Sequence, residues 1–263
     1  MKKLIMLCAV VFMFGSVMPI KAEENLNEDD GYKKYIENSA RDKADIFCEA
    51  LYQGKIGMAK YLIDQGIDTK NSLLCVLSDE IIPSNEIVEE LVNIVIDNGA
   101  DVNAKDKFGR TPLLFASRNR MKNVANVLLS KGAVIDNIEI AAYLGDINFV
   151  KKFLSQGNNI EEKYGYRGNT LLHYAAQEGN IKLAKFLLSK GASVNAKNER
   201  RSEAPLVTAV IYNQKKMIKF LILKGAEINS KDYDNATPLD NARTEEIKQL
   251  LIANGAKSGK DLK

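Results

Sequence analysis

The sequence has a single histidine, which excludes most of the usual arrangements of catalytic and metal-binding side chains. A Ser-His-Asp or Cys-His site would have to use His173, and two distant cysteines beyond the first 22 residues complete no cluster of metal ligands. A glycine-rich phosphate loop is also missing, because Gly165–Gly168 has neither the preceding strand nor the required spacing. We therefore expect no catalytic residue, no metal and no cofactor, and a hydrolase is kept only as a remote alternative.

The first 22 residues differ in composition from the rest of the chain. Lys2 and Lys3 precede an apolar run that extends to Pro19, and Ala22 stands before two glutamates. This order predicts a secretory signal peptide that is cleaved after Ala22, with the bacterial periplasm or the medium as its destination. An uncleaved membrane anchor is the alternative, but the apolar run is short for a span and ends at proline.

A strong net charge is also lacking once this segment is removed. The chain has 37 Lys and Arg against 34 Asp and Glu, and taking away Lys2, Lys3 and Lys21 leaves 34 of each. The mature chain is formally neutral, so its charge gives no reason to expect nucleic acid or an anionic membrane as a partner.

The sequence does contain a repeated segment, in which an apolar stretch ends in glycine. Seven glycines follow apolar stretches such as Phe186-Leu-Leu-Ser-Lys-Gly191, at intervals of 33, 33, 25, 34, 34 and 30 residues. They are Gly66, Gly99, Gly132, Gly157, Gly191, Gly225 and Gly255. A period of this size indicates a stacked repeat array, which holds an extended surface rather than a pocket.

Each of these segments is predicted to end an amphipathic helix. The apolar residues of 181–188 fall on one side at helical spacing, and the glycine after them can adopt the left-handed conformation that ends a helix. A shorter helix is predicted to begin at Thr111, Thr170, Ala204 and Thr237, where threonine or a following proline suits a helix start.

The segment from Gly168 to Ala196 resembles an ankyrin repeat almost residue for residue, and 108–133 is a close second. The resemblance covers roughly residues 42–256, most of the chain. It implies an all-α solenoid of about seven helix-turn-helix units with short projecting turns. We place the unit starts near Asp42, Ser72, Thr111, Asp136, Thr170, Ala204 and Thr237.

The remaining segments complete the predicted organisation. Residues 1–22 form the signal peptide, and 23–41 a polar segment with a possible capping helix at Tyr32–Ala40; residues 42–256 form the repeat domain and 257–263 a polar tail. The links after Gly66 and Gly132 are short, which removes a projecting turn. The second unit regains length through 79–86, which we expect to be a loop between its helices.

Cys48 and Cys75 occupy similar positions in adjacent units. Because an exported protein is delivered to an oxidising compartment, a disulfide between these residues is one alternative. Such a bridge would join the first two units covalently. Neighbouring helix axes lie roughly 8–10 Å apart, which is longer than disulfide geometry usually allows unless the side chains face each other. We therefore favour two small buried apolar residues over a bridge.

The resemblance also explains His173, because ankyrin repeats place a histidine in the phrase Thr-Leu-Leu-His for structural reasons. The threonine hydroxyl and the imidazole typically bond to each other and to the backbone. A structural role for His173 is therefore favoured over a catalytic one.

In ankyrin-like arrays the projecting turns, with the inner short helices, line the concave binding face. Here these fingers are 105–110, 163–167, 197–201 and 231–235, and they carry the aromatic and arginine residues that dominate interface energetics. The candidate partner-binding residues are Phe108, Arg110, Tyr164, Tyr166, Arg167, Arg200, Arg201 and Tyr233. We expect the aromatic residues to be exposed and the set to be locally positive, which would suit an acidic or mixed partner surface.

The sequence therefore predicts an exported, non-enzymatic protein-binding module, with a protein of unknown identity as its partner. It would be a monomer, with no contact to membrane after signal cleavage. Two other roles stay open within the binding class: a periplasmic companion that stabilises or regulates an exported enzyme, and a secreted effector that binds a host protein.

Overall fold

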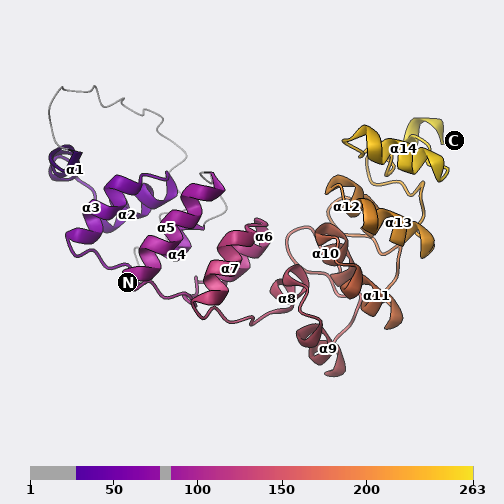
Figure 1. The fold of residues 1–263 in the computed structure, drawn as a ribbon, viewed down its shortest axis with the longest axis horizontal. Coiled ribbons are helices and arrows are strands. Elements are labelled where there is room, and N and C mark those ends of the chain that lie inside the picture. The colour runs from indigo at the N-terminus through magenta and orange to yellow at the C-terminus, as the bar shows by residue number, and fades with distance from the viewer. Residues whose placement is uncertain (1–27, 78–83, 263) are drawn as a thin grey trace. The chain divides into compact units, whose positions relative to one another are not determined.

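The computed structural model describes residues 28–77 and 84–262, and these form two compact units that meet in sequence at Val134 and Ile135. The described residues of both units are α-helices joined by turns, which confirms the all-α prediction (Figure 1). The expected signal peptide, residues 1–22, lies outside the described residues. No helix in the described ranges has both the length and the apolar character needed to cross a bilayer.

In the described residues of the N-terminal unit, a leading helix is followed by three pairs of helices. The pairs follow the predicted order of a helix, a turn and a second helix, and we number them as repeats 1 to 3. The helices are α1 Glu28–Glu37, then α2 Lys43–Tyr52 with α3 Ile56–Asp64, α4 Leu73–Val76 with α5 Asn85–Asp97, and α6 Pro112–Arg118 with α7 Lys122–Ser130.

The C-terminal unit continues the same order with repeats 4 to 7. Its helices are α8 Ile138–Leu144 with α9 Ile147–Ser155, α10 Leu171–Glu178 with α11 Ile181–Ser189, α12 Pro205–Ile211 with α13 Lys215–Leu223, and α14 Glu245–Ala253. A short 3-10 helix follows at Gly259–Asp261. The apolar core of this unit extends without a break from Ile138 in α8 to Leu251 in α14, and α10 packs against both α8 and α12.

The helix boundaries agree with the chemistry of the predicted start and stop residues. Thr111 and Thr170 each precede a helix and accept a hydrogen bond from its first turn, and the seven repeated glycines all have φ between +79° and +94°. Side chains rarely adopt this left-handed conformation, so glycine is needed there. The fourth repeat begins one residue later than expected, at Asn137, which is the N-cap of α8.

Asparagine side chains tie each of several repeats to the next one. Asn195 donates to the carbonyl of Gly225 (3.4 Å) and accepts from the N–H of Glu227 (2.9 Å). Asn103 and Asn229 make the equivalent pairs of bonds to the loops 132–134 and 255–257. Because these bonds satisfy backbone groups at helix ends, they fix the register between neighbouring hairpins.

Two helix predictions are wrong in their boundaries. The leading helix runs over Glu28–Glu37 instead of Tyr32–Ala40, and it packs against α3 with the Tyr32 and Tyr61 rings 6.0 Å apart. In repeat 2, α5 already begins at Asn85, inside the loop expected at 79–86, while residues 78–83 lie outside the described ranges.

The helix predicted to begin at Thr237 is absent, and residues 238–241 form a turn. The carboxylate of Asp240, three residues after Thr237, accepts hydrogen bonds from the N–H and the hydroxyl of Thr237. The same carboxylate accepts from the Ser258 hydroxyl (2.6 Å) and the Gly259 N–H (2.8 Å). The polar tail is therefore attached to this turn.

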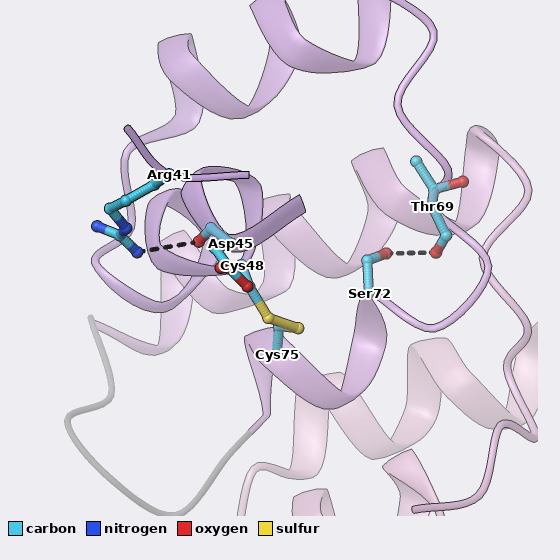
Figure 2. The surroundings of a disulfide bond; sticks show 6 residues. All are labelled: Arg41, Asp45, Cys48, Thr69, Ser72 and Cys75. Carbon is cyan, nitrogen blue, oxygen red and sulfur yellow. Dashed lines mark hydrogen bonds between the residues drawn. A yellow bond between two sulfur atoms is a disulfide. The ribbon is translucent and has the colours of Figure 1, made fainter. Parts of the chain in front are cut away.

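The interpretation of Cys48 and Cys75 as unbridged residues is also wrong, because they form a disulfide between α2 and α4 (Figure 2). Both residues are half-buried, and their Cα atoms lie 5.4 Å apart. The expectation used the distance between helix axes, but a disulfide depends on the distance between Cα atoms. Each Cα atom lies about 2.3 Å from its helix axis, so two Cα atoms that face each other across axes ~10 Å apart are separated by about 5.4 Å. The bridge joins repeats 1 and 2.

Candidate protein-binding surface

In the fingers 105–110, 197–201 and 231–235, one side chain near the base holds the turn. The Asp106 carboxylate accepts from the N–H groups of Phe108 and Arg110, both at 2.8 Å, and Asp232 accepts from Asp234 and Ala236, both at 2.9 Å. In the finger between them, Asn198 accepts from the N–H groups of Arg201 and Glu203. These bonds use the backbone of the tip and leave the side chains of the tip residues out of the turn.

The finger of repeat 3 presents Phe108, whose side chain is 67% exposed. The guanidinium of Arg110 lies 5.1 Å from the centre of the Phe108 ring and 4.7 Å from that of Phe115, and its Nε donates to Asp106 at 2.6 Å. Burial raises the pKa of Asp106, but the hydrogen bonds from Arg110 and Phe108 outweigh it and hold the pKa below its ordinary value. The charge of Arg110 is thus paired within its own finger.

The next finger presents Tyr166, which is 72% exposed and lies against two arginines. The guanidiniums of Arg167 and Arg200 are 5.5 Å and 5.0 Å from the centre of its ring, and Arg167 also donates to the Tyr166 hydroxyl at 3.0 Å. The carbonyl of Arg167 accepts the N–H groups of Glu199 and Arg200, each at 3.2 Å. Two successive fingers therefore come together at this point, and we call Tyr166, Arg167 and Arg200 the arginine–tyrosine cluster.

Tyr164 does not fit the prediction of an exposed aromatic tip. It is half-buried with its ring edge against Phe153 (6.5 Å between centres), its backbone pairs with Asn169, and its hydroxyl donates to Glu162. Burial, followed by the negative charge of Glu162, raises the pKa of Tyr164. Tyr164 thus holds the base of its finger, and its side chain is largely unavailable to a partner.

Arg201 also departs from the expectation of a locally positive surface. Its guanidinium lies 2.7 Å from Asp234, 3.5 Å from Asp232 and 3.6 Å from the buried carboxylate of Glu203. Its carbonyl accepts the N–H of Tyr233, which is 69% exposed. Arg201 therefore joins the fingers of repeats 6 and 7, and the carboxylates around it compensate its charge. Of Arg201 and Tyr233, Tyr233 is the residue that is more exposed to a partner.

The candidate residues are divided between the two units. Phe108 and Arg110 belong to the N-terminal unit, and the other six belong to the C-terminal unit, where Tyr166, Arg167 and Arg200 are in direct contact. The base residues Asp106, Asn198 and Asp232 were missed as organisers of these fingers. An aspartate or asparagine that opens a polar turn is the sequence feature that indicates this role.

His173 has the structural role that was expected of it. Its ring is fully buried; Nδ1 accepts from the Thr170 N–H (3.2 Å) and lies 2.9 Å from the Thr170 hydroxyl, while Nε2 lies 3.0 Å from the Glu203 carbonyl. The Thr170 N–H needs an acceptor, so Nε2 carries the proton and donates to Glu203. Burial lowers the pKa of His173 to about 4, against a raising effect of the Glu203 bond. Neither nitrogen is available to act on a substrate.

Residues able to hold a metal ion were also sought. Within residues 28–77 and 84–262, no group of three histidine, cysteine, aspartate or glutamate side chains is arranged to bind one. The chemistry that this surface offers is therefore that of exposed aromatic rings, guanidinium groups and turn backbone.

Comparison with known proteins finds relatives that match part of this chain. The chain is 36% identical over 78 residues to the human transient receptor potential cation channel subfamily A member 1, covering 30% of this chain and 6% of the channel. It is 29% identical over 118 residues to the variola virus ankyrin repeat protein OPG189, covering 39% of this chain and 21% of that protein. The chain thus spans a small part of the length of these relatives.

A solved structure shows a likeness of the same kind. The human ASB11 ankyrin repeat domain is 24% identical, and the match covers 80% of this chain and 98% of that domain, with a TM-score of 0.43.

The family profile described as ankyrin repeats (3 copies) matches residues 47–139 and again 138–232. The two matches together cover more than half of the sequence and include the helix pairs of repeats 2 to 6. The chain therefore belongs to the ankyrin repeat family.

Proposed function

We propose that this chain is a non-enzymatic module that binds a protein partner through the finger tips of its repeats. Ankyrin repeats generally serve as binding modules without catalytic activity, and this is the first support for the proposal. The residues that we assign to binding are the four exposed tips, Phe108, Tyr166, Arg200 and Tyr233. Arg110, Tyr164, Arg167 and Arg201 hold the fingers that carry them.

The observation that carries the proposal is the exposure of Tyr166 together with its fixed position. A large aromatic side chain that is 72% exposed covers no core, yet two guanidiniums and a hydrogen bond hold it in place. Rigid tyrosine and arginine side chains are enriched among the residues that contribute most to interface affinity, because little conformational entropy is lost when they bind.

We further propose that the module acts outside the cytoplasm of a bacterium, as a monomer. The support is the order of Lys2 and Lys3, the apolar run and Ala22 in the sequence. The disulfide between Cys48 and Cys75 agrees with an oxidising compartment. A resident companion of an exported enzyme and a secreted effector differ in where the partner is found.

The test is a crosslinked pull-down from the native envelope and medium with residues 23–263 as bait. The variant Tyr166→Ala/Arg167→Ala should retain the helical circular dichroism signal and lose most of the captured partner, because it removes the exposed ring together with the guanidinium that holds it. Leu223→Ala is the matched control, since Leu223 is 80% exposed but lies on the outer helix α13. Equal capture by the tip variant and the wild type would refute the proposed surface.

A further inference from the structure

We propose that the arginine–tyrosine cluster recognises a carboxylate in an acidic segment of the partner protein. This inference rests on the proposed function and adds the chemistry of the partner to it. It comes from comparing the arginines of successive fingers, which share a position near an exposed ring but differ in whether an acid neutralises them.

In two fingers, an arginine next to an exposed tip is already paired. Arg110 stacks on Phe108 and bonds to Asp106, and Arg201, whose carbonyl bonds Tyr233, contacts three carboxylates. A carboxylate from a partner would have to displace these internal acids, so neither guanidinium is a ready anion site.

Arg200 differs from both of these arginines. It is exposed, its guanidinium stacks on Tyr166, and no carboxylate within the described residues forms an ion pair with it. Its neighbour Glu199 lies 3.9 Å from Lys163, and Glu203 is buried beside Arg201. Arg167, the second guanidinium at the ring, donates to the Tyr166 hydroxyl. The cluster therefore offers one cation without a carboxylate partner beside a second one whose Nε–H bonds a neutral hydroxyl.

The backbone fixes this arrangement before any ligand binds. The two N–H bonds to the Arg167 carbonyl join fingers 163–167 and 197–201, and Gly168 (φ +60°) lets them approach closely. A Cβ at Gly168 would lie 2.6 Å from the Cβ of Glu199, so a larger residue would force the fingers apart. A guanidinium is planar and presents its N–H donors in a fixed fork, which can bond both oxygens of a carboxylate.

A carboxylate suits this site better than a chain of phosphates. Asp232, Asp234 and Glu199 lie on the same and the following finger, and the mature chain has as many acidic as basic residues. A polyanion that follows the fingers would meet these acids, whereas one carboxylate at Arg200 would not. The carboxylate can come from a glutamate or aspartate side chain or from a chain terminus.

The test uses synthetic ten-residue peptides and the arginine Nε–Hε signals of the ¹⁵N-labelled protein, residues 23–263. One peptide has two glutamates and blocked ends, a second has glutamines in their place, and a third has glutamines with a free C-terminal carboxylate. We expect the glutamate peptide to shift the Arg200 signal in a saturable way and the blocked glutamine peptide to leave it unchanged. A response to the third peptide alone would assign the site to a chain terminus.

The variants separate charge from geometry. Arg200→Gln should weaken the glutamate peptide about tenfold or more, the order expected for one charge-assisted hydrogen bond. Arg200→Lys should restore little of it, because an ammonium has no fork to bond both oxygens. Arg243→Gln is the matched control, and it should change nothing because Arg243 is an exposed arginine of the same unit that lies outside the fingers.

Two results would overturn the inference: equal binding of the glutamate peptide and the blocked glutamine peptide, or full binding by Arg200→Gln. The proposed function is tested separately by the pull-down. Capture that is lost in Tyr166→Ala/Arg167→Ala but kept in Arg200→Gln, with no response to either carboxylate peptide, would leave the interface standing and remove the carboxylate. Capture that ignores every tip variant would remove the interface itself.

Discussion

At the scale of the residue, the imidazole of His173 uses both nitrogens inside the protein, one toward Thr170 and one toward Glu203, which follows the next finger. The ring thus links the start of α10 to residues just before α12. Repeats 3 and 6 have Leu114 and Val207 at the corresponding place, three residues after the helix N-cap. The hydrogen-bonded histidine therefore stands where these two repeats have an apolar residue.

We predict that this histidine makes stability depend on pH between about 4 and 6.5. The pKa of His173 is about 4 in the folded chain and near 6.5 in the unfolded one, so the unfolded chain binds more protons in this range. The free energy of unfolding should therefore fall as pH decreases from 6.5 to 4, by up to about 3 kcal/mol. Urea unfolding at a series of pH values measures this slope.

The variant His173→Leu should be less stable at pH 7, because the Thr170 and Glu203 groups lose their partner. It should also lack most of the slope above pH 5, where carboxylates contribute little. Since the chain has one histidine, no other imidazole can supply that slope. An identical slope in the variant and the wild type would show that His173 is not its source.

At the scale of the element, α4 is a short helix that is joined to α2 by a disulfide. It has four residues, too few to be stable alone. It is held by the bridge from Cys75 to Cys48, and the Ser72 hydroxyl before it donates to the Thr69 carbonyl at 2.6 Å (Figure 2). The disulfide therefore supplies a constraint that the short helix cannot supply itself.

We predict that Cys48→Ala/Cys75→Ala lowers the free energy of unfolding of the N-terminal unit by about 3–4 kcal/mol. The chain-entropy estimate for a closed loop of about 27 residues gives this magnitude. Amide hydrogen exchange should lose protection first in α2 and α4. The helices α10 and α11 of the C-terminal unit serve as the internal control. Unchanged protection in α4 would mean that packing alone holds it.

The helix pairs were predictable from sequence because glycine spacing and apolar periodicity are local signals that recur in every repeat. The failures involve contacts between distant residues. Nothing near Thr237 in sequence shows that Asp240 will also bind Ser258, and nothing near Tyr164 shows that Phe153 will cover its ring. Arg201 was expected to add positive charge, but it meets Asp232 and Asp234 from the following repeat. Residue types at the tips were visible in the sequence, whereas their pairing was not.

At the scale of the whole molecule, neighbouring repeats contribute residues to a shared apolar core. Leu187, Leu206 and Leu251 come from three different repeats and belong to one core. The Asn103, Asn195 and Asn229 bonds add polar links between successive loops. Stability is thus distributed along the array, and binding residues on the tips contribute little to it.

We predict that the chain isolated from its native cell begins at Glu23 and is found in the periplasm or the medium. Mass spectrometry of the N-terminus and cell fractionation measure the two parts of this prediction. A protein that retains Met1 and is found in the membrane would indicate the uncleaved anchor. A protein that retains Met1 in the cytoplasm would contradict export altogether.

The bonds that Asp106 and Asp232 make at the base of their fingers have a consequence for how the chain could acquire new binding partners. Asp106 and Asp232 hold their turns through backbone N–H groups, so Phe108 and Tyr233 can be exchanged without undoing the loop. Mutation can then explore different tip chemistries while the architecture stays constant. Libraries randomised at Phe108 and Tyr233 can therefore start from this chain. Variants with a few substitutions at these positions could bind different proteins.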